Sequence, residues 1–227
     1  MTTLLHIDSS ARPGRAGEHP HGSQTRRLSH AFATRWLAAQ PGAGVVYRDL
    51  GTMPPRPVHH DWIPSAYTPE AHRTPAQRAA LHDSDRLVQE LKDCDVLAFG
   101  MPMYNFGMPA PVKAWVDNIV RIALTLDIDP TRPNPYVPLL ADKPRKAVIL
   151  TSRGSHGFDA GGVQARLNYA DTALREVLAL IGITDVRTIA VEREEEGGQA
   201  LADSVAQALR RIDALVADWA APVALPA

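Results

Sequence analysis

The chain has 227 residues, of which 45% are hydrophobic and 22% are charged, and its formal net charge is −1. This composition is typical of a folded globular protein and excludes intrinsic disorder as the main state. The nearly neutral balance also excludes a general electrostatic attraction to nucleic acid or to an anionic membrane.

Strands and helices alternate in the predicted order of elements. Five short apolar runs predict strands at 4–7, 44–47, 95–100, 146–151 and 185–191. Because these runs do not alternate strictly with polar residues, we expect strands buried on both faces. Apolar residues spaced by three or four predict helices within 28–36, 112–123, 167–181 and 201–216, and a less regular pattern predicts one within 74–92. This order predicts a parallel α/β sheet with helices on both faces, in one domain over 1–227.

Two proline-rich segments, 51–75 and 123–144, interrupt this alternation. Loops of this length are uncommon in a compact domain and are often lids or binding loops. Irregular surface crossings without a role in binding are the alternative.

In an open parallel sheet, ligands bind beyond the carboxyl ends of the strands, near the point where the strand order reverses. The loop after the first strand contains Asp8-Ser9-Ser10 and ends at Ser23-Gln24-Thr25, where the next helix begins. Hydroxyl groups and free N–H groups at a helix N-terminus can hold a phosphate, or Ser23 can act as a cap alone. Neither a dinucleotide fingerprint nor a Walker P-loop is present in the sequence.

The loops after the third and fourth strands complete this edge of the sheet. Met101 to Pro109 contains large apolar side chains beside Asn105, which fits the wall of a site for a flat apolar ligand. The segment 151–157 carries glycines that allow its backbone to approach a ligand closely. It also contains His156, which is either a candidate proton donor or a solvated loop histidine. A phosphate cradle beside an aromatic wall indicates a mononucleotide with a flat ring, for which flavin mononucleotide (FMN) is the natural candidate.

Four segments, in order along nearly the whole chain, resemble the FMN-dependent NADH-azoreductase and NAD(P)H quinone reductase family. They are Asp8-Ser9-Ser10 with Ser23-Gln24-Thr25, then Pro102-Met103-Tyr104-Asn105-Phe106, Thr151-Ser152-Arg153-Gly154-Ser155, and Gly182-Ile183-Thr184-Asp185-Val186. The resemblance implies a flavodoxin-like three-layer sandwich with a five-stranded parallel sheet of order 2-1-3-4-5. It also implies a homodimer that passes hydride from NADH or NADPH through FMN to a quinone or azo compound. Because donor and acceptor would stack on one flavin face in turn, we expect a ping-pong mechanism, and a cytoplasmic location is expected since no targeting segment is predicted.

The resemblance also implies roles for single residues. Ser10, Ser23, Gln24 and Thr25 would hold the phosphate of FMN. Pro102, Met103, Tyr104, Asn105 and Phe106 would line one side of the ring, and Ser152, Arg153, Gly154 and Ser155 would follow its pyrimidine edge. Tyr104, Asn105 and His156 are the candidates for a catalytic role. Aromatic residues expected in loops are candidates for the dimer interface: Trp62, Tyr67, Tyr136 and Phe158.

The chain also departs from the family. Its first loop is longer, over 12–22, and 124–140 replaces a segment that covers the substrate side of the flavin in the family. A reductase specific for one quinone, azo or related N–N or N–O compound therefore stays open, as does a non-catalytic electron carrier.

A metal hydrolase is a further alternative, built on His59, His60, Asp61 and His72. No metal-ligand spacing supports it there or at His19 and His21, so no metal site is expected. The single cysteine, Cys94, excludes a disulfide framework and fits a reducing compartment. The N-terminal segment has no basic stretch before an apolar run, and prolines interrupt the uncharged stretch 96–112, so neither a secretory signal nor a membrane span is expected.

Overall fold

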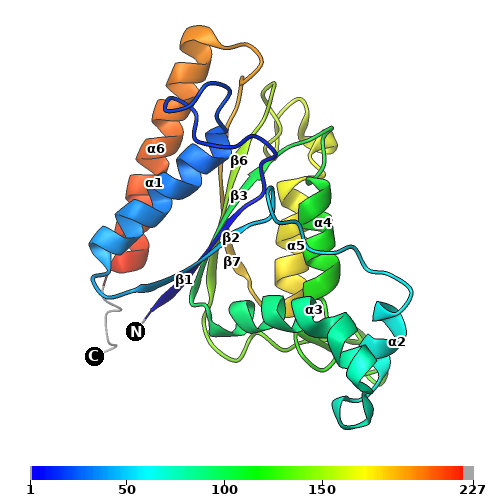
Figure 1. Ribbon diagram of the computed structural model, residues 1–227. Coiled ribbons are helices and arrows are strands. Elements are labelled where there is room, and N and C mark those ends of the chain that lie inside the picture. Colours follow the sequence, from blue (N-terminus) through cyan, green and yellow to red (C-terminus); the bar gives the residue numbers. More distant parts are fainter. Residues whose placement is uncertain (1, 222–227) are drawn as a thin grey trace.

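A parallel sheet of five strands forms the centre of the computed structural model, which describes residues 2–221 (Figure 1). Its strand order is β2-β1-β3-β6-β7, which is the predicted order 2-1-3-4-5 counted within the sheet. The strands are β1 (Thr3–Asp8), β2 (Gly44–Asp49), β3 (Val96–Pro102), β6 (Lys146–Ser152) and β7 (Asp185–Val191). The chain reverses direction across the sheet between β1 and β3, so the loops after these two strands face one another at the switch point.

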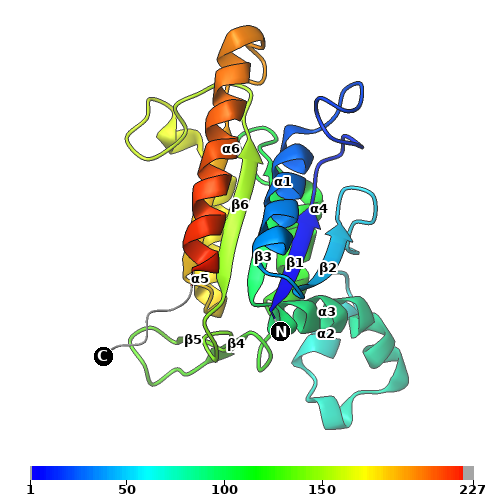
Figure 2. The same cartoon turned by 90° about the vertical axis from the view of Figure 1, so that its left-hand side faces the viewer.

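Helices cover both faces of the sheet, as Figures 1 and 2 show. On one face lie α1 (Gln24–Ala39) and α6 (Gly198–Ala220). On the other lie α3 (Pro75–Asp93), α4 (Ala110–Ile119) and α5 (Asp171–Ile181). Each face has its own hydrophobic core, and all seven residues of β3 are buried between the two. In contrast, β2 is an edge strand whose Val45, Val46 and Tyr47 are exposed.

Local sequence signals fix the helix ends. The Ser23 hydroxyl accepts a hydrogen bond from the Arg26 N–H at the start of α1. Thr74 and Gln77 form a reciprocal capping box at the start of α3, where Pro75 occupies the first helical position. At the end of α5, Gly182 takes a left-handed conformation with φ 109°, which glycine adopts without strain.

Both proline-rich segments contain structure that the sequence pattern did not predict. Within 51–75, α2 (Trp62–Tyr67) packs beside α3, and the 3₁₀ turn η1 (Glu70–His72) follows it in the chain. Within 123–144, β4 (Leu126–Ile128) and β5 (Tyr136–Pro138) form an antiparallel hairpin. These elements are too short to show a helical or strand period in the sequence.

Two predicted helix ranges are wrong at one end. The pattern over 112–123 continues beyond α4, because the chain turns at 121–126, where the Thr125 hydroxyl donates to the Ile119 carbonyl. The pattern over 167–181 begins before α5, because 165–167 form the separate 3₁₀ turn η2 (Ala165–Leu167).

Candidate functional site

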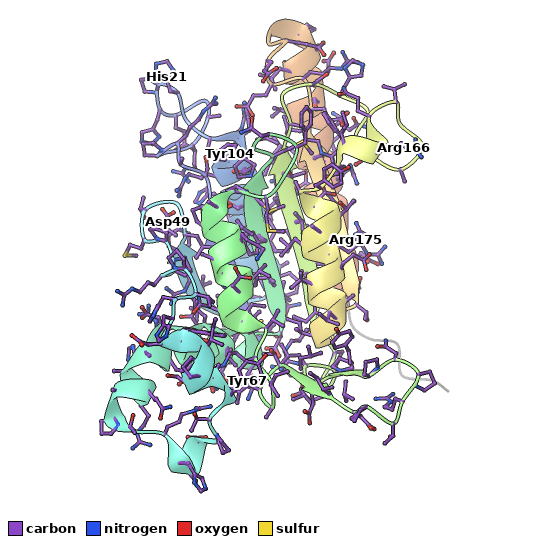
Figure 3. The ribbon with its side chains drawn as sticks, turned by 90° about the vertical axis from the view of Figure 1, so that its right-hand side faces the viewer. His21, Asp49, Tyr67, Tyr104, Arg166 and Arg175 are labelled. Atoms are coloured by element: carbon purple, nitrogen blue, oxygen red, sulfur yellow. The ribbon has the colours of Figure 1, made fainter. Side chains whose placement is uncertain are left out.

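A cleft of about 540 Å³ opens at the carboxyl end of the sheet, within the range typical of small-molecule sites. The loops after β1, β3, β6 and β7 line it. Figure 3 shows Tyr104 beyond the end of β3 and His21 in the loop that leads to α1. Eight predicted site residues line this cleft: Ser10, Ser23, Gln24, Pro102, Met103, Tyr104, Ser152 and Gly154.

The N-terminus of α1 forms one end of the cleft. Ser23 and Thr25 are buried with their hydroxyl oxygens 2.9 Å apart, and Ser10 is buried beside them. The Gln24 side-chain carbonyl oxygen is also buried, and it has no hydrogen-bond partner among the described residues. A ligand with a phosphate and a nearby hydrogen-bond donor would match both features, because the first turn of a helix offers unpaired N–H groups.

The buried Arg26 side chain holds the backbone of the first loop at this end of the cleft. Arg26 forms two hydrogen bonds of 2.8 Å to the Asp49 carboxylate. It also donates from Nε to the Arg12 carbonyl and from Nη2 to the Ser10 carbonyl, both at 2.9 Å. Burial alone would lower the pKa of Arg26, but the hydrogen bond to Asp49 and the charges of Asp8 and Asp49 outweigh it and raise that pKa. Arg26 therefore stays charged and fixes the backbone of the first loop.

The extended first loop forms one wall of the cleft. It is closed at its base by hydrogen bonds between the Ala16 N–H and the Ser23 carbonyl and between the Ser23 N–H and the Gly14 carbonyl. At its start, Arg12 Nη1 lies 2.6 Å from Glu194 Oε1. This ion pair joins the first loop to the loop after β7 across the cleft.

Tyr104 links the second loop to the first, because its hydroxyl accepts a hydrogen bond from the Ala11 N–H. Tyr104 and Gly107 exchange two backbone hydrogen bonds around a two-residue turn at Asn105 and Phe106, whose φ angles are 48° and 67°. A turn with positive φ at both central positions is normally built from Asn and Gly, so Phe106 is held in a strained conformation. Neither Asn105 nor Phe106 lines the cleft in the single chain.

In the third loop, Ser152 and Gly154 line the cleft but Arg153 does not. The Arg153 guanidinium is buried and pairs with three carboxylates at 2.8 to 3.0 Å, those of Asp159, Asp171 and Glu192. Its N–H and carbonyl bond to Val191 and Glu194 in the next strand and loop. The Arg153 side chain therefore anchors the third loop to its neighbours, and the cofactor contact implied by the resemblance stays a prediction.

Three further predicted residues also lie outside the cleft lining. Thr25 is fully buried beside Ser23, and Ser155 accepts a hydrogen bond from Gln164. The His156 ring is half-exposed, with Nδ1 3.1 Å from Glu196 Oε1. Of the three candidates for a catalytic role, only Tyr104 faces the cleft.

Sequence reasoning missed several residues that line the cleft. They are Arg12, Ala16, Gly17, His19, His21 and Gly22 from the extended loop, and Glu194, Glu195 and Leu201 after β7. The rule that selected the other three loops applies equally to the end of the last strand, so it could have found Glu194 and Glu195.

The divergent segment 124–140 lies at the opposite end of the sheet from the cleft of its own chain. The Leu140 N–H bonds to the Ile181 carbonyl at the end of α5, and Figure 2 shows β4 and β5 below that helix. Segment 124–140 therefore does not line the cleft of its own chain.

The aromatic residues proposed for an interface divide into two pairs. Trp62 is buried at the start of α2, with the Arg121 guanidinium 5.5 Å from its ring centroid, and Phe158 is buried near Arg153. Trp62 and Phe158 are therefore packed within the chain, and Trp62 lies in a helix and not in the expected loop. Tyr67 and Tyr136 are exposed.

No group of three or more potential metal ligands occurs in residues 2–221. His60 Nδ1 lies 3.1 Å from Asp61 Oδ1, and both side chains are largely exposed. Among the helices that the structure describes, none combines the length and the apolar character needed to cross a membrane.

A family model described as a flavodoxin-like fold matches residues 2–216. The chain belongs to this family. One relative from Pseudomonas aeruginosa, an FMN-dependent NAD(P)H:quinone oxidoreductase, is 41% identical over 95% of this chain and 98% of its own length. An FMN-dependent NADH:quinone oxidoreductase from Idiomarina loihiensis is 37% identical over 96% of this chain and 90% of its own.

Solved structures support the same fold. An azoreductase from Bacillus anthracis is similar with a TM-score of 0.82 and 22% identity, over 96% of this chain and all of the other. At this level of identity the similarity establishes the arrangement of elements. The predicted family resemblance and the flavodoxin-like fold are thus confirmed.

Proposed function

We propose that this protein binds FMN in the cleft and uses NADH or NADPH to reduce quinones, azo compounds or both. The observation that carries the proposal is the pairing of the α1 N-terminus with the aromatic second loop in one cleft. The names of relatives that match over nearly their whole length, given above, support this reading.

The residues present fit FMN. Ser10, Ser23 and the first N–H groups of α1 would receive its phosphate. The unpartnered Gln24 oxygen would accept a hydrogen bond from a ribityl hydroxyl or a ring N–H. Met103 and Tyr104 would lie along one side of the ring, and Ser152 and Gly154 along its edge.

When bound, FMN would take a hydride from NAD(P)H and pass two electrons on to the acceptor, so that NAD(P)H, a proton and a quinone give NAD(P)⁺ and a hydroquinone. The chain would contribute binding and orientation. Its hydrogen-bonded loops hold the wall residues in place, since the Met103 N–H bonds to the Ser152 carbonyl at 2.9 Å. One open side of the cleft would serve donor and acceptor in turn, which leads to a ping-pong rate law.

We also propose that the protein is a cytoplasmic homodimer. Exposed apolar side chains, including Ile63, Tyr67, Phe106 and Tyr169, are candidates for the contact between subunits. One buried thiol, Cys94, is compatible with a reducing compartment.

An absorption spectrum of the purified protein, followed by anaerobic addition of NADH or NADPH, tests the proposal. A flavin band that bleaches is expected, with parallel double-reciprocal lines when donor and quinone are varied. A band that neither donor bleaches would indicate an electron carrier, and failure to bind added FMN would contradict the site. Sedimentation of the same sample distinguishes a dimer from a monomer.

A further inference from the structure

Three consecutive glutamates after β7 have different surroundings. Glu194 pairs with Arg12 across the cleft at 2.6 Å. Glu196 pairs with Arg193 at 2.6 Å and with His156 at 3.1 Å, outside the cleft lining. Glu195 lines the cleft, and within residues 2–221 no cation lies at ion-pair distance from it.

Gly154 makes room for the Glu195 side chain. A Cβ atom at Gly154 would lie 2.6 Å from both Cδ and Oε1 of Glu195, too close for any real contact. The Glu195 N–H also donates to the Gly154 carbonyl at 3.0 Å. Because Gly154 follows β6 and itself lines the cleft, the Glu195 carboxylate lies directly over the loop that would border the flavin ring.

We propose that Glu195 is an electrostatic determinant of the cofactor's reduction potential, an inference that rests on the proposed binding of FMN. A hydride brings two electrons and one proton, so its transfer adds one negative charge to the bound ring. Glu195 is exposed in the unliganded chain. An unpaired carboxylate beside the ring opposes the added charge. Glu195 therefore lowers the reduction potential and makes the reduced cofactor a stronger electron donor.

The neighbouring charges do not cancel this effect. Arg12 is already paired with Glu194, and the other basic side chains of the lining, His19 and His21, belong to the extended first loop. The Arg193 guanidinium forms an ion pair with Glu196. The carboxylate of Glu195 is thus the one acidic group in the described lining that has no ion-pair partner.

Spectroscopic redox titration of the FMN-bound protein against a reference dye tests the proposal. We expect Glu195→Gln to make the midpoint potential more positive, by an amount that shrinks at high ionic strength. Glu196→Gln removes the same charge one residue away and should leave the potential unchanged. Gly154→Ala keeps the charge but displaces the carboxylate, so it should shift the potential in the same direction as Glu195→Gln.

An unchanged or more negative potential in Glu195→Gln would overturn the proposal, and so would equal shifts in Glu195→Gln and Glu196→Gln. Circular dichroism of each variant confirms that it is folded before the titration. If the wild-type protein takes up no FMN, the proposed function fails and this inference fails with it. If FMN binds but Glu195→Gln matches the wild type, only the role of Glu195 fails.

Discussion

Arg26 and Asp49 are joined by two hydrogen bonds of 2.8 Å although they lie 23 residues apart in the sequence. The pair connects the first turn of α1 to the end of β2. Two further N–H groups of Arg26 donate to the Ser10 and Arg12 carbonyls, so one buried side chain fixes the shape of the loop at the α1 end of the cleft.

Replacement of Arg26 should therefore lower both the stability of the fold and the affinity for FMN. We expect Arg26→Met to lower the free energy of unfolding by about 3 kcal/mol, because it leaves a partly buried Asp49 carboxylate without its partner. FMN affinity should fall as well, since the first loop loses its anchor. Urea denaturation without added FMN and fluorescence titration with FMN measure the two effects. Arg27→Met, at a half-buried neighbouring position, is the control and should change neither strongly.

The same pair predicts how stability depends on pH. Burial alone raises the pKa of Asp49, but the hydrogen bond and charge of Arg26 outweigh it and hold that pKa below its usual value. Because the pKa of Asp49 is lower in the folded state, the ion pair contributes fully to the free energy of unfolding above the unfolded pKa of about 4. This contribution is lost as pH falls through the folded-state pKa. Urea midpoints between pH 7 and pH 3 should show this loss. In Asp49→Asn the same acid range should show a smaller decline; an identical decline would contradict the assignment.

Two helix caps provide a matched comparison. Ser23 caps α1 in the cleft, and Thr74 caps α3 away from it. Ser23→Ala and Thr74→Ala should each lower the free energy of unfolding by about 1 kcal/mol. Only Ser23→Ala should weaken FMN binding, because only that hydroxyl lies where the phosphate would bind. Equal loss of FMN affinity in both variants would mean that affinity follows stability alone.

Cys94 offers a chemical probe of folding. Its thiol is buried, and this burial raises its pKa to about 12. A thiol-specific colour reagent at pH 8 should therefore leave the native protein unmodified and should label one thiol per chain in denaturant. Rapid labelling of the native protein would contradict the buried position of Cys94.

The sequence predicted the sheet well because its three central strands, β1, β3 and β6, are buried on both faces and form continuous apolar runs. The expectation of burial on both faces is wrong for β2, because an edge strand leaves side chains in contact with solvent. It predicted the cleft loops through one rule, the carboxyl ends of parallel strands, which placed Ser10, Tyr104 and Gly154 together. It did not predict the anchoring roles of Arg26 and Arg153, because their partners are distant in sequence. The elements α2 and β4–β5 were also missed, since they depend on packing more than on a local period.

The strained turn at Asn105 and Phe106 has a consequence for directed evolution. Each non-glycine residue held at positive φ costs on the order of 1–3 kcal/mol, with Asn at the lower end. A selection for heat resistance alone would therefore favour glycine at position 106 early. Glycine at this position would also make the loop that carries Tyr104 more flexible. The selected variants would therefore be more thermostable but less active.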